Sequence, residues 1–187
     1  MQELINSYLD NSSKINSLIN VNEVIKFVRA LKKVQDHKKK VFIVGNGGSA
    51  STATHFATDL GVGTLKVSKP VRAISLTDNL AILTAVSNDI DFNSIFSQQI
   101  EVLAEPNDLL VLISASGNSA NLISAYETSK TLGMESFSLT GFDGGKLRAL
   151  MREDNLHVPT KNGQYGLVED AHLAICHIVT ECIRKVN

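Results

Sequence analysis

The chain contains 187 residues, of which 43% are hydrophobic and 20% are charged, a balance that suits a globular domain and excludes disordered and low-complexity proteins. Its formal net charge of -1 gives no overall field toward a nucleic-acid backbone or an anionic membrane, so we expect neither as a partner. The two cysteines form no disulfide framework and no paired zinc pattern, which favours a reducing, cytoplasmic location. The first residues lack the layout of a signal peptide, and no run approaches the ~18 apolar residues of a membrane helix.

Residues 1–36 carry apolar side chains at helical spacing, which predicts two amphipathic helices with a break near Asn20. No internal repeat or Pro-rich linker marks a boundary, so we expect one domain over 1–187. Because apolar residues lie on more than one side of the helical pair, we expect the pair to take part in oligomerisation. The alternative is that both helices pack only on the sheet of their own chain.

Five short apolar runs follow, and each predicts a buried strand. They cover 41–44, 71–76, 109–113, 135–139 and, with a weaker pattern, 156–158. Helix-sized segments separate these runs, and a final helix is predicted over 167–185. The pattern predicts the α/β class, with a five-stranded parallel sheet flanked by helices and preceded by the N-terminal helical pair.

Two of the strand-to-helix loops have the composition of neutral anion-binding sites. Residues 45–50 contain three glycines, which let the backbone approach an anion closely, and Ser49 adds a hydroxyl. Residues 114–119 contain Ser114, Ser116 and Ser119 at a second junction of the same kind. Each loop could be a simple connection, but the occurrence of two in one short domain favours phosphate binding. The junction at 140–146 predicts a turn and a helix start without chemistry.

Carboxylates and histidines are concentrated in two predicted helices. His55 and Asp59 are spaced i, i+4 and share a helix face, which suits a metal ion or one substrate hydroxyl. Glu169 and His177 lie in the last helix, about 12 Å apart along its axis, so helical geometry alone does not bring both to one ion. They could meet if Glu169 lay in a frayed first turn or if different chains contributed them. The histidines could also be packed or surface residues, and Asp78, which follows the second strand, could be a helix cap.

Taken together, these motifs resemble the phosphoheptose isomerases of the sugar isomerase (SIS) fold, a flavodoxin-like α/β domain. The matching segments are 44–50 with His55 and Asp59, then 76–78, 88–89, 114–121, 139–146 and 169–177, so the resemblance spans about residues 5–185. It implies isomerisation of sedoheptulose 7-phosphate to D-glycero-D-manno-heptose 7-phosphate through an enediol. It also implies a homotetramer with active sites at subunit interfaces and one zinc ion per subunit.

The resemblance further implies roles for individual residues. Phosphate and substrate binding falls to Asn46, Gly47, Ser49, Asp78, Ser114, Ser116, Asn118, Ser119 and Glu169. The catalytic acid and base correspond to Asp59 and His177, and the metal ligands to His55, Asp59, Glu169 and His177.

Three positions depart from the family pattern. Asp59 stands where the family usually has Glu, which draws the carboxylate back by roughly 1 Å. Glu169 stands where the family usually has Gln and adds a negative charge beside the expected metal, and Gly63 replaces a common Arg. These departures keep two alternatives open: an isomerase of another phosphosugar, and a non-catalytic SIS tetramer that binds a replication initiator protein.

Overall fold

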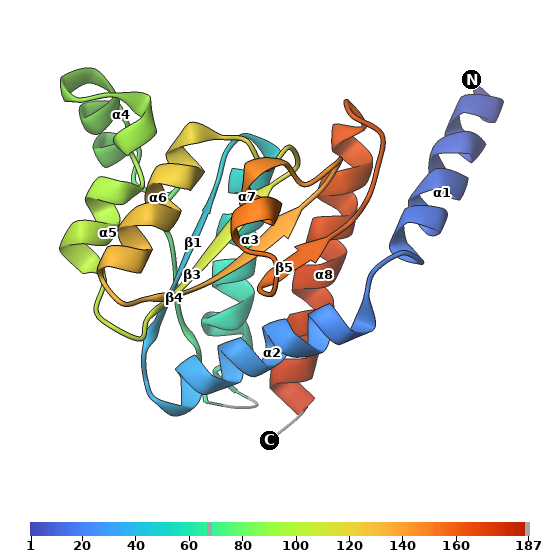
Figure 1. Ribbon diagram of the computed structural model, residues 1–187. Coiled ribbons are helices and arrows are strands. Elements are labelled where there is room, and N and C mark those ends of the chain that lie inside the picture. Colours follow the sequence, from blue (N-terminus) through green and yellow to red (C-terminus); the bar gives the residue numbers. More distant parts are fainter. Residues whose placement is uncertain (67–68, 186–187) are drawn as a thin grey trace.

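The computed structural model describes residues 1–66 and 69–185, which form helices and strands in alternation (Figure 1). The helices are α1 Gln2–Asn16, α2 Val21–Asp36, α3 Gly48–Leu60, α4 Leu80–Asp89, α5 Ser97–Leu103, α6 Ala120–Thr131, α7 Gly145–Leu150 and α8 Tyr165–Lys185, with short 3-10 turns at Val62–Thr64 and Phe92–Ser94. The strands are β1 Lys40–Gly45, β2 Arg72–Ser75, β3 Leu109–Ser114, β4 Glu135–Thr140 and β5 Asn155–His157. The predicted strands are therefore confirmed, with ends that shift by at most one residue.

The five strands form one sheet in the order β2-β1-β3-β4-β5, and every neighbouring pair is parallel. This is the flavodoxin-like order that the fold class predicts. The direction of winding reverses between β1 and β3, which lie side by side with Gly45 opposite Ile113. In open α/β sheets, ligands bind at the carboxyl ends of the strands that flank such a switch point. The two loops rich in glycine and serine follow these two strands.

Two apolar layers cover the sheet. On one face, residues of α2, α3 and α8 pack against the strands, and the Phe27 ring of α2 stacks on Phe137 of β4 with centroids 4.4 Å apart. On the other face, residues of α5, α6 and α7 form a second buried cluster that includes Ile100 and Leu122. Because β1 and β3 carry buried side chains toward both layers, their sequences read as continuous apolar runs.

The N-terminal helices differ from each other in what they bury. The Asn20 side chain accepts hydrogen bonds from the N–H groups of Asn22 and Glu23, which confirms the predicted break and starts α2. While α2 buries Phe27 against the sheet, α1 lies along α8, outside the main body, and exposes Leu4 (Figure 1). The alternative that both helices pack on their own sheet therefore holds for α2 and fails for α1.

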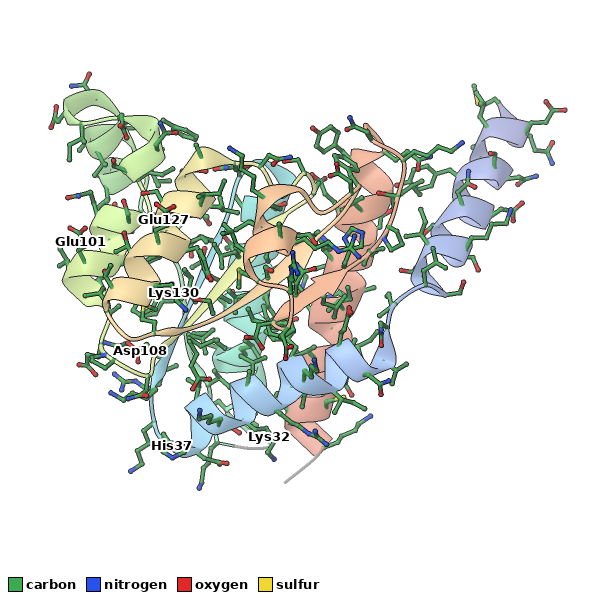
Figure 2. The ribbon with its side chains drawn as sticks, in the orientation of Figure 1. Lys32, His37, Glu101, Asp108, Glu127 and Lys130 are labelled. Atoms are coloured by element: carbon green, nitrogen blue, oxygen red, sulfur yellow. The ribbon has the colours of Figure 1, made fainter. Side chains whose placement is uncertain are left out.

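A structural carboxylate, Asp108, lies at the amino-terminal ends of the strands, just before β3 (Figure 2). Its side chain is buried and accepts hydrogen bonds from the N–H groups of Lys40, at 2.8 Å, and Glu105, at 2.9 Å. Because both oxygens are paired with backbone N–H groups, one in β1 and one in the turn before β3, this group maintains the fold. In the part of the chain that the structure describes, no helix combines the length and the apolar composition that crossing a membrane requires.

Candidate active site

The loop after β1 turns tightly into α3. Gly47, at the N-cap of α3, has a φ of 55°, a left-handed conformation that favours glycine. The Ser49 N–H donates to the Asn46 carbonyl at 3.0 Å, and the Ser49 side chain is buried. The loop therefore forms a compact turn at the N-terminus of α3, where a helix dipole favours an anion.

The loop after β3 is held by its own hydroxyls. Ser114 Oγ accepts a hydrogen bond from the Gly117 N–H at 3.0 Å, and Ser116 Oγ accepts one from the Asn118 N–H at 3.3 Å. Gly117 has a φ of 64°, and a Cβ at this position would lie 2.0 Å from the Gly144 carbonyl oxygen. This loop therefore requires glycine at 117 for two separate reasons.

The third junction, 140–146, supports the second loop. The Leu147 N–H donates to the Gly117 carbonyl at 2.9 Å, and the Lys146 N–H donates to Asn118 Oδ1 at 3.1 Å. The Asn118 side chain therefore caps α7, and the predicted turn and helix start are confirmed. Ser119 sits at the N-cap of α6 with an extended backbone and no hydrogen bond from its side chain to the helix.

A reciprocal amide pair joins the first two loops. Asn46 Nδ2 donates to Asn121 Oδ1 and Asn121 Nδ2 donates to Asn46 Oδ1, both at 2.9 Å. Sequence reasoning gave Asn46 a place in the pocket but gave Asn121 no role. The available signal was a polar side chain in the first turn of a helix that follows a serine-rich loop, which does not identify a partner 75 residues away.

Three side chains from α3 and α8 converge where these helices pack side by side. His177 Nε2 lies 3.2 Å from His55 Nε2 and 3.9 Å from Asp59 Oδ2, and His55 Nε2 lies 3.4 Å from the same Asp59 oxygen. The side chains of the two histidines are about half exposed, while that of Asp59 is 25% exposed. The i, i+4 pair on α3 is thus joined by a histidine 122 residues further along the chain. We refer to these three residues as the His-Asp-His cluster.

The donor set of this cluster fits a divalent metal ion. Its three ligand atoms lie within 4.8 Å of one another. In a tetrahedral zinc site with bonds of about 2.0–2.2 Å, neighbouring ligand atoms lie roughly 3.3–3.6 Å apart, close to the separations above. Two imidazole nitrogens and one carboxylate leave a fourth position open, as in catalytic zinc sites. A depression of about 520 Å³, lined by His177, Ile178, Glu181, Cys182 and Lys185, adjoins the cluster.

Glu169 lies outside the His-Asp-His cluster. It is the fifth residue of α8, beyond the first turn, so the frayed start that could bring it to His177 is absent. Its carboxylate lies against Gly48, since a Cβ there would approach all three carboxyl atoms to 2.3 Å. Within one chain, the structure thus places Glu169 beside the first loop, at the N-terminal end of α3.

Asp78 follows β2 and contacts α3 through Thr54. It accepts a hydrogen bond from Thr54 Oγ1, and Thr77 and Ser75 complete a small hydroxyl network around it. Asp78 is exposed at the carboxyl end of β2, so it remains available to a ligand. The next residue, Asn79, is the one whose side chain caps α4, so the cap reading of Asp78 does not hold.

Two buried residues on α8 have strongly perturbed protonation. Burial lowers the pKa of His172 to about 4, and the nearby Thr140 backbone offsets only part of this effect. Neither His172 ring nitrogen has a hydrogen bond of good geometry among the described residues. Burial, followed by the charge of Asp59, raises the pKa of the Cys176 thiol well above its usual range. His172 is therefore a neutral packed histidine, as one of the two readings of the sequence anticipated.

Comparisons with known proteins agree with this geometry. The sequence model of the SIS domain family matches residues 7–141. A phosphoheptose isomerase of Helicobacter pylori strain P12 is 40% identical over 171 residues, which cover 90% of this chain and 87% of the relative. Two solved structures of phosphoheptose isomerases superpose closely. The structure from Neisseria gonorrhoeae has a TM-score of 0.89 at 30% identity and covers 99% of both chains. The structure from Francisella tularensis has a TM-score of 0.90 at 29% identity and covers 98% of both.

The match thus extends over the loops at the switch point and over both helices that carry the His-Asp-His cluster. On this evidence the chain belongs to the SIS domain family and, within it, to the phosphoheptose isomerases.

Proposed function

We propose that this chain is a cytoplasmic phosphoheptose isomerase that converts sedoheptulose 7-phosphate to D-glycero-D-manno-heptose 7-phosphate. The observation that carries the proposal is the grouping of Asp59 and His177, a carboxylate and an imidazole whose Oδ2 and Nε2 atoms lie 3.9 Å apart. An aldose-ketose isomerisation needs one group to take a carbon-bound proton and another to serve the carbonyl oxygen. Relatives named phosphoheptose isomerase support the choice of substrate.

The two loops at the switch point are suited to hold the phosphate. Neutral donors in the loops 45–50 and 114–119 are Ser49, Ser114, Ser116 and Ser119, with Asn46, Gly47, Asp78 and Asn118 lining the same region. His55 lies seven residues beyond Gly48 on α3, roughly 10 Å along the helix axis. This separation is comparable with the length of an open-chain heptose phosphate, so C1 and C2 would reach the His-Asp-His cluster.

In the mechanism, Asp59 removes a proton from C1 while His177 donates one to the carbonyl oxygen at C2. The product of this step is the cis-enediol. The C1 hydroxyl then loses its proton as C2 regains one, which leaves an aldehyde at C1 and balances both protons. Each transfer is typical of general acid-base catalysis by a positioned side chain.

We further propose one zinc ion per subunit, held by His55, Asp59 and His177. Glu169 lies at the other end of α3, beside Gly48, and is not a ligand of this ion within one chain. Such an ion would stabilise the negative charge of the enediolate. His177 Nε2 cannot bind an ion and donate a proton at the same time, so the metal-dependent and metal-free versions make opposite predictions for chelation.

The exposure of the cluster supports an assembly that covers it. A reactive enediolate needs protection from water, yet both histidines are about half exposed in one chain. The outer helix α1 presents Leu4, Ile5 and Leu9 to solvent at 76%, 54% and 61% exposure. We propose a homotetramer with active sites at subunit interfaces and residues 1–36 in the contacts. Light scattering of the wild type and of Leu9→Asp tests this, since the variant should dissociate.

The decisive experiment is turnover of sedoheptulose 7-phosphate by purified protein, with added zinc and after chelation. Product that disappears on chelation would support the metal-dependent mechanism, while product that persists would assign the proton transfers to Asp59 and His177 alone. If no product forms in either condition but a pentose or hexose phosphate from a parallel panel is turned over, the enzyme acts on that phosphosugar and not on sedoheptulose 7-phosphate. Absence of any turnover would overturn the enzyme assignment.

A further inference from the structure

Arg184, in the last turn of α8, reaches across to the segment that follows α3. Its Nη2 donates a hydrogen bond to the Gly63 carbonyl at 2.9 Å, and its Nη1 donates to Glu181 Oε1 at 3.1 Å. Its Nε is buried and has no hydrogen-bond partner among the described residues. The guanidinium is thus held by two contacts in a fixed orientation between the two helices that carry the His-Asp-His cluster.

Gly63 is four residues beyond Asp59, in the 3-10 turn Val62–Thr64. A Cβ on Gly63 would lie 2.9 Å from Arg184 Nη2 and 3.8 Å from Asp59 Oδ1. The Arg184 guanidinium and the Asp59 carboxylate therefore both lie close to the Cα of Gly63. The φ of Gly63 is not positive, so the backbone does not demand glycine there. What glycine provides at this position is room for the guanidinium.

This contact ties the turn that follows α3 to α8. Asp59 lies in the last turn of α3, where the final carbonyls have no donors within the helix. This turn has no basic residue of its own, although a cation there is favourable to the helix dipole. Arg184 supplies a positive charge from α8, and its hydrogen bond fixes the Gly63 carbonyl in the turn just beyond the last residue of α3. A shift in this turn would move the Asp59 carboxylate relative to His177.

On the basis of the proposed function, we propose that Arg184 is a positioning residue for the isomerisation. It fixes the turn after α3 and thereby holds Asp59 in register with His55 and His177. Gly63 is needed for the same contact, because any side chain at this position displaces the Arg184 guanidinium. The phosphate loops lie at the opposite end of α3 and are outside the reach of this contact.

Two substitutions test the inference from opposite sides. Arg184→Lys retains the charge but loses the two-pronged hydrogen bonding, and Gly63→Ala displaces the guanidinium, whose flexible tip is the atom closest to the new Cβ. Both should lower kcat about tenfold with KM within about twofold, since small displacements at a reacting group cost rate. The double variant should be no worse than either single variant, because both remove one contact. Lys185→Gln is the matched control, since Lys185 pairs with Glu181 from the same turn.

Zinc affinity of the metal-free protein, measured by calorimetry, gives a second readout that does not need turnover. Both variants should bind zinc about tenfold more weakly than the wild type and the control, at an unchanged melting temperature. Wild-type kcat and zinc affinity in Gly63→Ala and Arg184→Lys would overturn the inference, as would additive losses in the double variant. Where the wild type itself turned over no phosphosugar, the proposed function would fail and the zinc titration would decide the inference alone.

Discussion

The two halves of the site are built in different ways. In the loops after β1 and β3, backbone and side-chain polar groups pair with each other, through Asn46 with Asn121 and through Ser114 with Gly117. In the His-Asp-His cluster, the polar atoms of two half-exposed histidines and a partly buried aspartate face one another across 3.2–3.9 Å. The polar groups of the loops pair with each other, whereas those of the cluster are partly open to solvent.

Under the proposed function, this difference separates phosphate binding from proton transfer. A phosphate group is the same in every phosphosugar, so a rigid backbone cradle can be prepared for it before the ligand arrives. Proton transfer needs groups that change charge during the reaction, and such groups must stay accessible to the substrate. Changes in the loops should therefore affect folding and binding together, while changes in the cluster should affect turnover with folding preserved.

The largest expected effect concerns the cluster. Asp59→Asn and His177→Gln should each reduce turnover about 10²–10⁴-fold, the usual contribution of a general acid or base. Inhibition by inorganic phosphate should remain at its wild-type level, because the loops are untouched. Full turnover in folded variants would show that the proton transfers are made by other groups.

The second prediction compares two glycines of the loops. Gly117→Ala should destabilise the protein by about 4 kcal/mol, since the new Cβ meets the Gly144 carbonyl oxygen at 2.0 Å in a left-handed backbone. Gly47→Ala should cost less, about 1–3 kcal/mol, because only the backbone strain of its positive φ applies where no atom lies within 4 Å. Denaturant unfolding measures both, and equal losses would contradict the close contact between the second and third loops.

A third prediction uses pH. Because burial lowers the pKa of His172 to about 4, the unfolded chain binds a proton near the ordinary value of 6.5 while the folded protein does not. Stability should therefore fall as the pH is lowered from 6.5 to about 4, by roughly 3 kcal/mol from this residue. His172→Leu should flatten that part of the stability curve. Urea unfolding with chelator present measures it, and an unchanged slope would contradict the neutral buried state.

The smallest expected effect concerns the link between the two loops. Asn46→Ala and Asn121→Ala should be coupled in a double-mutant cycle by about 1 kcal/mol, since each substitution leaves the partner amide unpaired. Asn88→Ala, at an exposed position, serves as the control. A coupling energy near zero would mean that the loops are held independently.

Much of the fold could be predicted from the sequence because its signals are local. Apolar runs of strand length located the strands to within one residue, and the loss of helical spacing near Asn20 located the break between the first two helices. The i, i+4 spacing of His55 and Asp59 likewise places both on one face of α3 without further information. The outward position of α1 was harder, because an apolar helix face does not reveal whether its cover is the same chain or another.

The remaining parts of the site depend on contacts between distant segments. Gly63 suggested a lost arginine contact, whereas the structure brings the guanidinium of Arg184 to this glycine from 121 residues away. Asn121 lies in an ordinary helix start, and its partner is set by the packing of β1 beside β3. Glu169 shared a helix with His177, and the parallel packing of α3 and α8 sends the two to opposite ends of α3.

The two cysteines of α8 make the chain a convenient subject for site-directed labelling. Cys176 is fully buried, and its raised pKa keeps the thiol protonated and unreactive. Cys182 is partly exposed and lines the depression beside His177. A thiol-specific fluorophore should therefore attach at one position in the native protein. Without any substitution, its emission would report on events at the His-Asp-His cluster.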